Sequence, residues 1–393
     1  MTPQPDLPEN DSESFFQPNP AVQSLKDLID LVSGRNLHEQ TVQEDAGYAE
    51  NLPYPFLALV GQKQMKLALC LAVINPQIGG ILLTGPRGTG KTTAVRSLVS
   101  LFPEVERSAC FYGCLPEDIE QGGMDAVCPD CARKYGLGQP LTLHDHVKLI
   151  ELPLNARLED VVGGIDERAA NDRMKLKRGI LAHADGNVLY VDEVNMLNNE
   201  IVNAFLDASA TGSFTVRRGP ITATYRSKFT LIGSMNPEEG NLRAQIMDRF
   251  GLRVIVNGLN APQERLEAYR RVCAYRENPR GFLAQYANET AVAAQEIVRA
   301  REILHQVQIP EALQRVGVQL IQTLNITSLR AEITLFEAAR AMAAADNRLI
   351  VERADFEQVA PLALRLRRSV FMGNFLEQQA LEEAEISETL ARF

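Results

Sequence analysis

The chain has 393 residues, of which 45% are hydrophobic and 23% charged, and its 40 basic and 50 acidic side chains give a formal charge of −10. This length allows two or three domains and a core that needs no disulfide or metal. The acidic balance argues against a protein that coats nucleic acid, because affinity for phosphates comes from clustered lysines and arginines.

Membrane and export signals are missing from the sequence pattern. The longest apolar run, residues 67–74, is far shorter than the roughly 20 residues of a membrane-spanning helix. The chain starts with MTPQPDLPENDSES, which is acidic and proline-rich and has no apolar leader or Arg-rich transit pattern. Six cysteines and no tryptophan do not suggest a disulfide scaffold. We expect a cytoplasmic protein whose residues 1–50 form a disordered or linker-like extension.

Apolar strands and amphipathic helices alternate from Tyr54 onward, as in α/β proteins. The candidates for buried strands are Ile81–Thr84, Lys148–Leu152, Val188–Val191, Phe229–Ile232 and Leu252–Val256. The sequence therefore predicts an α/β domain at 51–260.

Helical patterns replace the strands after Ala261. One helix is expected to start at Pro310, because proline suits a first helical turn. Its apolar residues on one face are Leu313, Val316, Leu320 and Leu324. We expect an all-helical domain at 261–371 and an acidic C-terminal helix at 372–393.

A phosphate-binding loop follows the first predicted strand. The segment GPRGTGKT, from Gly85 to Thr92, fits the pattern G-x-x-x-x-G-K-[ST], with a strand before it and a helical pattern after it. Glycines let backbone N–H groups face a phosphate, and the helix N-terminus adds its positive dipole end. Lys91 is expected to reach the β- and γ-phosphates of a nucleotide, and the Thr92 hydroxyl to ligate Mg²⁺.

Two acids end a later apolar strand, about a hundred residues downstream. In the segment NVLYVDE, Asp192 would hold Mg²⁺ through water and Glu193 would polarise an attacking water. Acids are common at strand ends, but this spacing after a full phosphate loop favours a hydrolytic site.

Two further polar residues follow at the next strand. Asn236 could contact the γ-phosphate or the water, or cap a turn before Pro237. Arg249 could stabilise transition-state charge on a neighbouring subunit's ATP, although spacing alone favours a surface or ion-paired arginine.

These elements together resemble the AAA+ ATPases and, within them, the ATPase I subunits of magnesium chelatase. The resemblance spans about residues 54–368 and rests on several segments of this chain, namely PFLALVGQKQMKLAL, GGILLTGPRGTGKTTAVRSL, GGIDERAA, RGILAHADGNVLYVDEVNMLN, GSMNPEEGNLRAQIMDRFGL, SLRAEITLFEAARAMAA and VAPLALRLR. The resemblance implies an AAA+ P-loop core with a parallel sheet, an all-helical lid and ATP hydrolysis that drives Mg²⁺ insertion into protoporphyrin IX.

The resemblance also assigns roles to individual residues. It makes Asn236 the sensor 1 residue, Arg249 the arginine finger and Arg330 the sensor 2 arginine, whose alternatives are helix capping or an ion pair with Glu332. Arg243 is a second candidate for an intersubunit contact. The nucleotide-binding set becomes Val60, Gly61, Gly85, Pro86, Arg87, Gly88, Thr89, Gly90, Lys91, Thr92, Thr93 and Asp192.

Two insertions and three kinds of partner follow from the same resemblance. Residues 158–178 and 211–228 would form hairpins that project towards partner subunits, with Arg217 and Arg218 as candidate contacts. The expected partners are further copies in a hexameric ring, a second AAA+-like subunit and a porphyrin-binding subunit.

Four cysteines form a separate cluster in an expected insertion at 108–135. Cys110-x₃-Cys114-x₁₃-Cys128-x₂-Cys131 has two close pairs, which can supply four thiolates to a tetrahedral Zn²⁺ site. In the cytosol zinc is preferable to two disulfides. Our hypothesis is a structural zinc clip, and the alternatives are a redox-sensing pair or four unrelated thiols.

Four other functions stay open at this point. A cobalt-chelatase small subunit or a MoxR-type metal-insertion chaperone would share the same ATP residues. A nucleic-acid AAA+ motor would need basic hairpin tips, and the acidic total argues against it. A scaffold that binds ATP without hydrolysis would not need Glu193, Asn236 or Arg249.

Overall fold

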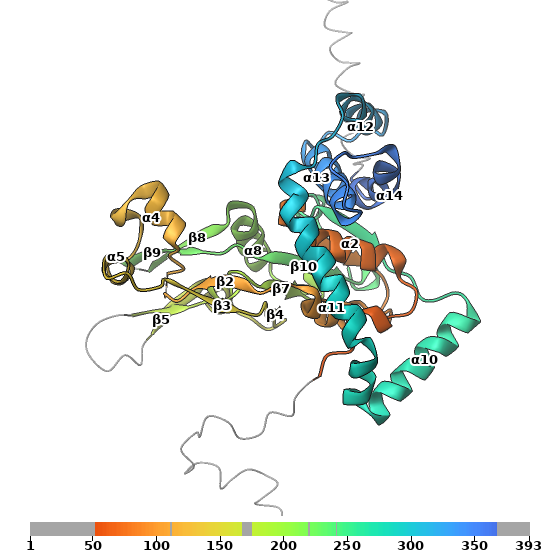
Figure 1. The fold of residues 1–393 in the computed structure, drawn as a ribbon, viewed down its shortest axis with the longest axis horizontal. Helices are drawn as coiled ribbons and strands as arrows, with labels where there is room; N and C mark the ends of the chain where they lie inside the picture. The colour runs from red at the N-terminus through yellow and green to blue at the C-terminus, as the bar shows by residue number, and fades with distance from the viewer. Residues whose placement is uncertain (1–51, 111, 167–174, 219–220, 241, 368–393) are drawn as a thin grey trace, which may run out of the picture. The chain divides into compact units, whose positions relative to one another are not determined.

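The computed structural model describes residues 52–110, 112–166, 175–218, 221–240 and 242–367 (Figure 1). The side chains at 165, 166, 175, 176, 218 and 221 are not described either. The predicted extension at 1–50, the predicted helix at 372–393 and the Arg218 side chain therefore lie outside the described residues.

A five-stranded parallel sheet forms the centre of the α/β part. Its strands are β1 (Ile81–Thr84), β4 (Leu149–Leu152), β7 (Val188–Val191), β10 (Thr230–Met235) and β11 (Leu252–Ile255), in the order β11-β1-β10-β7-β4. All four pairings are parallel, so the carboxyl ends of the strands lie at one edge of the sheet. The five predicted strands are thus confirmed, with ends that differ by up to three residues.

Helices cover both faces of this sheet, and successive side chains along a strand point alternately to one face and the other. Ile81 and Leu83 of β1 join the core made with α2 (Lys63–Ile74) and α3 (Lys91–Leu98). Leu82 points into the opposite core, which includes α8 (Asn199–Thr211). Strands buried on both faces need continuous apolar sequence, which is why ILLT and VLYV could be recognised without a period-2 pattern.

The C-terminal part is helical, as predicted. It consists of α10 (Pro262–Glu277), α11 (Pro279–Ile303), α12 (Glu311–Thr323), α13 (Arg330–Ala345) and α14 (Arg353–Leu364). None of the helices in the described ranges is both long and apolar enough to cross a membrane.

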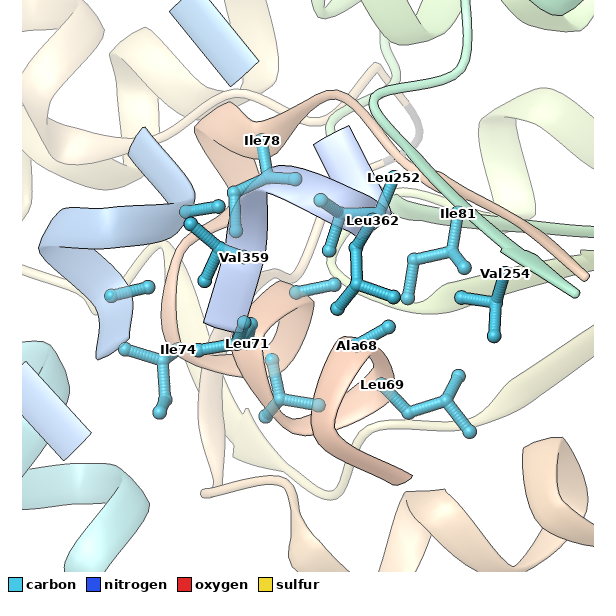
Figure 2. Packing of buried hydrophobic residues seen from close by; sticks show 14 of the residues in the cluster. Ala68, Leu69, Leu71, Ile74, Ile78, Ile81, Leu252, Val254, Val359 and Leu362 are labelled. Atoms are coloured by element: carbon cyan, nitrogen blue, oxygen red, sulfur yellow. The ribbon is translucent and has the colours of Figure 1, made fainter. Parts of the chain in front are cut away.

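One hydrophobic core joins the helical part to the sheet. Figure 2 shows Val359 and Leu362 of α14 beside Leu71 of α2 and beside Leu252 and Val254 of β11, all in the same buried cluster. Burying an aliphatic side chain of this size contributes roughly 1.5–3 kcal/mol. The helical part is therefore held to the α/β part by core packing as well as by the connecting chain.

The predicted face of α12 behaves differently from an ordinary core face. Val316 is 51% exposed and Leu320 36% exposed, whereas Gly317 and Ile321 are buried. Val316 and Leu320 instead line an apolar cavity of about 840 Å³ together with Phe356 and Pro361. The spacing thus identified an apolar face, but only its edge enters the core.

Smaller elements leave the central sheet at three places. The hairpins β5–β6 (Gly163–Asp166 with Lys175–Arg178) and β8–β9 (Ser213–Arg218 with Ile221–Arg226) lie within the two predicted insertions. The third is the cysteine insertion, with α4 (Pro116–Gly122) and α5 (Pro129–Gly136), between the paired strands β2 (Val105–Ser108) and β3 (Thr142–Asp145). The remaining α-helices of the described residues are α6 (Leu158–Val162), α7 (Ile180–His183) and α9 (Ala244–Met247).

Candidate active site

The phosphate loop connects β1 to α3 at the carboxyl edge of the sheet. A Cβ at Gly85 would collide with the carbonyl oxygen of Val256, so the loop needs glycine there to pass β11. Gly90 takes φ +85° and precedes α3 without a capping side chain. The first N–H groups of α3 therefore stay available for an anion.

Lys91 lies folded back on this loop. Its Nζ donates hydrogen bonds to the carbonyl oxygens of Gly85 at 2.7 Å and Pro86 at 2.8 Å. Burial lowers the pKa of Lys91, and the nearby Asp192 and Glu193 carboxylates partly oppose that effect. The ammonium group is thus placed at the loop and surrounded by acids that favour its charged form.

Oxygen ligands suited to Mg²⁺ meet at the next strand ends. Thr92 Oγ1 lies 3.4 Å from Asp192 Oδ2 and 3.1 Å from the Tyr190 hydroxyl. The Tyr190 hydroxyl donates to Asp192 Oδ1 at 3.0 Å, and the Ser234 hydroxyl donates to the same oxygen. Burial raises the pKa of Tyr190, which keeps its hydroxyl protonated as a donor. A hydroxyl facing a carboxylate fits the hard oxygen ligands that Mg²⁺ prefers.

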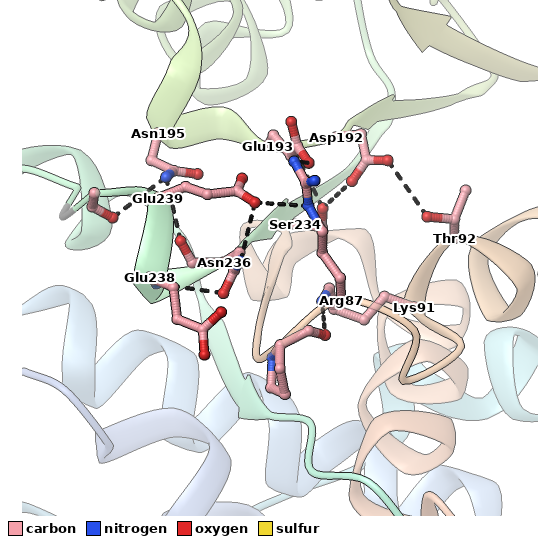
Figure 3. A network of polar contacts seen from close by, with 12 residues as sticks. Arg87, Lys91, Thr92, Asp192, Glu193, Asn195, Ser234, Asn236, Glu238 and Glu239 are labelled. Atoms are coloured by element: carbon pink, nitrogen blue, oxygen red, sulfur yellow. Dashed lines mark hydrogen bonds and ion pairs between the residues drawn. The ribbon is translucent and has the colours of Figure 1, made fainter.

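Glu193 belongs to a second polar network, which Figure 3 shows in full. Arg87 bridges Glu193 Oε1 at 3.0 Å and Glu239 Oε1 at 2.6 Å. Asn236 Nδ2 donates to the same Glu239 oxygen at 3.0 Å. Glu193 itself has φ +50°, which turns the chain sharply after β7. The network brings together Arg87, Glu193 and Asn236, three residues that the sequence analysis singled out.

Two joined cavities lie around the loop. A polar one of about 290 Å³ is lined by Lys91, Thr92, Asp192, Glu193 and Asn236, among others. A more apolar one of about 360 Å³ shares Gly88–Gly90 and Thr93 with it, and its walls include Tyr54, Val60, Met65, Leu259 and Val272. The pair has a polar end for phosphates and an apolar end for a planar base.

Val60 and Gly61 belong to the nucleotide-binding set that the resemblance implies, and they lie at the apolar cavity and directly next to it. Val60 lines the apolar cavity. Gly61 is next to it with φ +64°, and a Cβ there would lie 2.6 Å from Leu259 Cδ2. Gln62 Nε2 donates to the Asn257 carbonyl oxygen at 2.7 Å and closes this side of the cavity.

The three predicted intersubunit or sensor arginines line neither of these two cavities. Arg249 ion-pairs with Asp207 of α8 at 2.5 Å, and Arg243 is exposed at the start of α9. Arg330, whose side chain is half exposed, lies 3.9 Å from Asp248. The alternative partner predicted for Arg330 was Glu332. In the structure the ion pair is with Asp248 instead, because the start of α13 faces the turn between α9 and β11.

Asp248 joins the two parts of the chain through buried cations. Its Oδ1 lies 2.8 Å from Arg367 and 3.4 Å from Arg253, and its Oδ2 accepts a hydrogen bond from Ser328 at 2.7 Å. The Arg367 and Arg253 side chains are 0% and 1% exposed. Burial and the neighbouring Arg367 lower the pKa of Arg253 to about 10, and Asp248 opposes this.

The sequence analysis missed several residues that complete the site. They are Tyr190, Ser234 and Glu239. Asp248, which it also did not single out, lines neither cavity and joins the two parts of the chain. Tyr190 carried a weak signal, because a hydroxyl at the end of an apolar strand two residues before an acid has polar neighbours. The only sequence signal for Glu239 was its position in the segment NPEEG.

Comparisons with known proteins agree with this geometry. A family model described as an AAA domain matches residues 77–218, and one described as an AAA lid domain matches residues 316–389. The chain is 40% identical over 335 residues to the magnesium-chelatase subunit ChlI homolog of Methanocaldococcus jannaschii, which covers 84% of this chain and 90% of the relative. It is 39% identical over 317 residues to the magnesium-chelatase 38 kDa subunit of Acidiphilium rubrum, covering 80% and 90%.

A solved structure has the same fold at lower identity. It is a putative ATPase from Cytophaga hutchinsonii, 21% identical, with a TM-score of 0.52 over 79% of this chain and 84% of that one.

Proposed function

Because the chain belongs to the magnesium-chelatase I-subunit family of AAA+ ATPases, we propose that it is the ATP-hydrolysing motor subunit of a magnesium chelatase. In this role it drives Mg²⁺ insertion into protoporphyrin IX, which a separate subunit binds. The observation that carries the proposal is the polar cavity, where Lys91, Thr92, Asp192, Glu193 and Asn236 meet beside a joined apolar cavity.

The residues of the polar cavity divide the work of ATP hydrolysis. The backbone N–H groups of the loop and Lys91 bind the phosphates. Thr92 and Asp192 would hold Mg²⁺, which neutralises charge on the phosphate oxygens. Glu193 orients and polarises the attacking water, and Asn236 holds the γ-phosphate or that water.

Arg87 occupies the entrance to this arrangement in the structure. Its ion pairs with Glu193 and Glu239 keep the carboxylate of Glu193 engaged. When ATP binds, its γ-phosphate competes for the Arg87 guanidinium, because a phosphate accepts the same bidentate donors as a carboxylate. Glu193 is then released towards the water.

Arg249 supplies the transition-state cation to a neighbouring copy. It is partly exposed, pairs with Asp207 on the surface of α8 and lines neither cavity of its own chain. Each ATP site is then completed only in an assembly, which we infer to be a ring and, by family resemblance, a hexamer. Arg243 and Arg330 are further candidates for contacts near the shared site.

The same proposal includes two other subunits and a location. A second AAA+-like subunit and the porphyrin-binding subunit would contact the hairpins β5–β6 and β8–β9, of which the second carries the exposed Arg217. We place the complex in the cytoplasm.

The experiment measures ATP turnover against protein concentration for the wild type, Arg249→Ala and a control, Arg315→Ala. Arg315 is a good control because, within the described part of the chain, its one ion pair is an exposed one with Glu311 on α12. We expect wild-type turnover per chain to rise with concentration as copies assemble. Arg249→Ala should assemble and bind ATP, but turnover should fall by about 10³-fold, while Arg315→Ala matches the wild type. A wild-type rate in assembled Arg249→Ala would refute the finger role.

A second measurement tests the chelatase role separately. Co-purified partner subunits, protoporphyrin IX, Mg²⁺ and ATP are mixed, and formation of the Mg²⁺ porphyrin is followed by fluorescence. Metal insertion that needs both this chain and ATP supports the proposal. Turnover of ATP without any insertion would contradict it and leave a related AAA+ motor, such as a cobalt-chelatase subunit or a MoxR-type chaperone.

A further inference from the structure

The four cysteines of the insertion between β2 and β3 converge on one point. The Sγ atoms of Cys110, Cys114, Cys128 and Cys131 all lie within 4.8 Å of one another, and none of the four forms a disulfide. Four thiolates around Zn²⁺ at about 2.3 Å would lie about 3.8 Å apart, as tetrahedral geometry requires. Small side-chain rotations therefore convert the observed cluster into a zinc-binding one.

Backbone N–H groups already point at two of these sulfur atoms. The N–H groups of Tyr112 and Cys114 donate to Cys110 Sγ at 3.2 and 3.4 Å. The N–H group of Cys128 donates to Cys114 Sγ at 3.4 Å. Such donors orient metal ligands and offset the negative charge that several thiolates share. Four thiols packed only for their apolar character would not need them.

The insertion has too little apolar core to hold its shape alone. Apart from the cysteines, its buried cluster consists of Ile119, Val127 and Leu141, separate from the two cores of the sheet. A segment of this size normally needs a metal or disulfides for a fixed fold. Cys131 is 1% exposed and Cys114 8% exposed, so the sulfur atoms take the place of a core.

The insertion packs on the hairpin β8–β9 and not on the ATP site. Asp118 of α4 lies 3.5 Å from Arg226 of β9, and the rings of Tyr112 and Tyr225 stack at 5.9 Å. Figure 1 places α4 and α5 beside this hairpin. Whatever fixes the insertion therefore also fixes the base of the hairpin.

We propose that Cys110, Cys114, Cys128 and Cys131 bind one structural Zn²⁺, and that this ion holds the insertion as a brace against β8–β9. With four protein thiolates the ion has no open position, so the site is structural and takes no part in hydrolysis. Its function is to present the hairpin in one orientation, independently of bound nucleotide.

The test uses the full chain, purified without metal-affinity resin, and measures zinc by elemental analysis. We expect about one zinc per chain in the wild type and in Cys273→Ser, a cysteine of α10 outside the cluster. Cys128→Ser should lose the metal. Cys128→His should keep it, because Cys₃His is also a structural zinc set. Replacing zinc by cobalt should give the thiolate-to-cobalt charge-transfer band in the wild type and none in Cys128→Ser.

Hydrogen exchange tests the brace. Removing zinc with a chelator should speed amide exchange in α4, α5 and β9, while β1 and β10 keep their protection. A wild-type protein with no bound zinc and no cobalt band would overturn the proposal. A Cys110–Cys131 or other disulfide, found by mass spectrometry after alkylation, would replace it by the redox alternative. Bound zinc with unchanged exchange in β9 would refute the brace.

Discussion

Replacing Asp248 by asparagine should be among the most destabilising charge changes in the described part of the chain. The change keeps the size of the side chain and removes one negative charge. It leaves the fully buried Arg367, at 2.8 Å, and the nearly buried Arg253, at 3.4 Å, facing each other without their acid. Burial already disfavours the charged form of both arginines and lowers their pKa values, and Asp248 opposes this effect. Removing the charge of Asp248 therefore destabilises the folded state.

The magnitude follows from what remains after the change. Breaking a buried ion pair by removing one partner typically costs about 3–5 kcal/mol. Here Arg253 still donates to the Leu366 carbonyl oxygen at 2.5 Å and Arg367 to that of Gly251 at 2.9 Å. Asp248 is also 32% exposed, so water weakens its interaction. We therefore expect the lower end, about 3 kcal/mol, which is a large part of an ordinary domain's stability.

The assay is urea unfolding followed by circular dichroism, since the chain has no tryptophan. Glu311→Gln is the control, because it removes one acid from an ion pair whose side chains are 79% and 77% exposed. Glu311→Gln should lower the free energy of unfolding by less than about 0.5 kcal/mol. Asp248→Asn should keep its deficit in high salt, which screens exposed pairs but not buried ones. Equal midpoints for the two variants would refute the argument, and a more stable Asp248→Asn would mean that desolvation of the acid outweighs its attraction.

Two further changes test the ATP site. Glu193→Gln should bind ATP normally but hydrolyse it about 10²- to 10⁴-fold more slowly, because the amide cannot polarise the water; equal turnover would move the general base elsewhere. Tyr190→Phe removes the hydroxyl that joins Thr92 to Asp192. One such hydrogen bond is worth about 1 kcal/mol, so half-maximal turnover should need about fivefold more Mg²⁺, with a far smaller change in turnover at saturating Mg²⁺. An unchanged Mg²⁺ requirement would mean that Tyr190 only packs.

The strands could be predicted because the signal for each lies within its own few residues. ILLT and VLYV are buried on both faces of a parallel sheet, and such strands are short continuous apolar runs. Lys91, Thr92 and Asp192 could be proposed as ATP-site residues for a similar reason, because glycines, lysine and acids have fixed places relative to their own strand or helix.

The missed residues depend on pairings between distant segments. Ser234 reaches Asp192 only because β10 lies beside β7, with Gly233 opposite Val191. Nothing in either segment alone specifies that register. Glu239 contributes only because Arg87 crosses to it from the phosphate loop. Residues within a motif can be recognised from the sequence, but side chains that meet only through the order of the strands cannot.

The contacts of Asp248 show that a domain boundary read from composition need not be a boundary between independently stable parts. The change from strands to helices near residue 261 is real, since β11 ends at Ile255 and α10 starts at Pro262. Yet Asp248, before that change, binds Arg367 from beyond α14, and α14 packs its Val359 and Leu362 into the sheet core. The helical part cannot leave the sheet without exposing those aliphatic side chains and separating buried charges. Motion of this part during hydrolysis must therefore be a small shift about this junction, because a full opening would cost a large part of the stability of the fold.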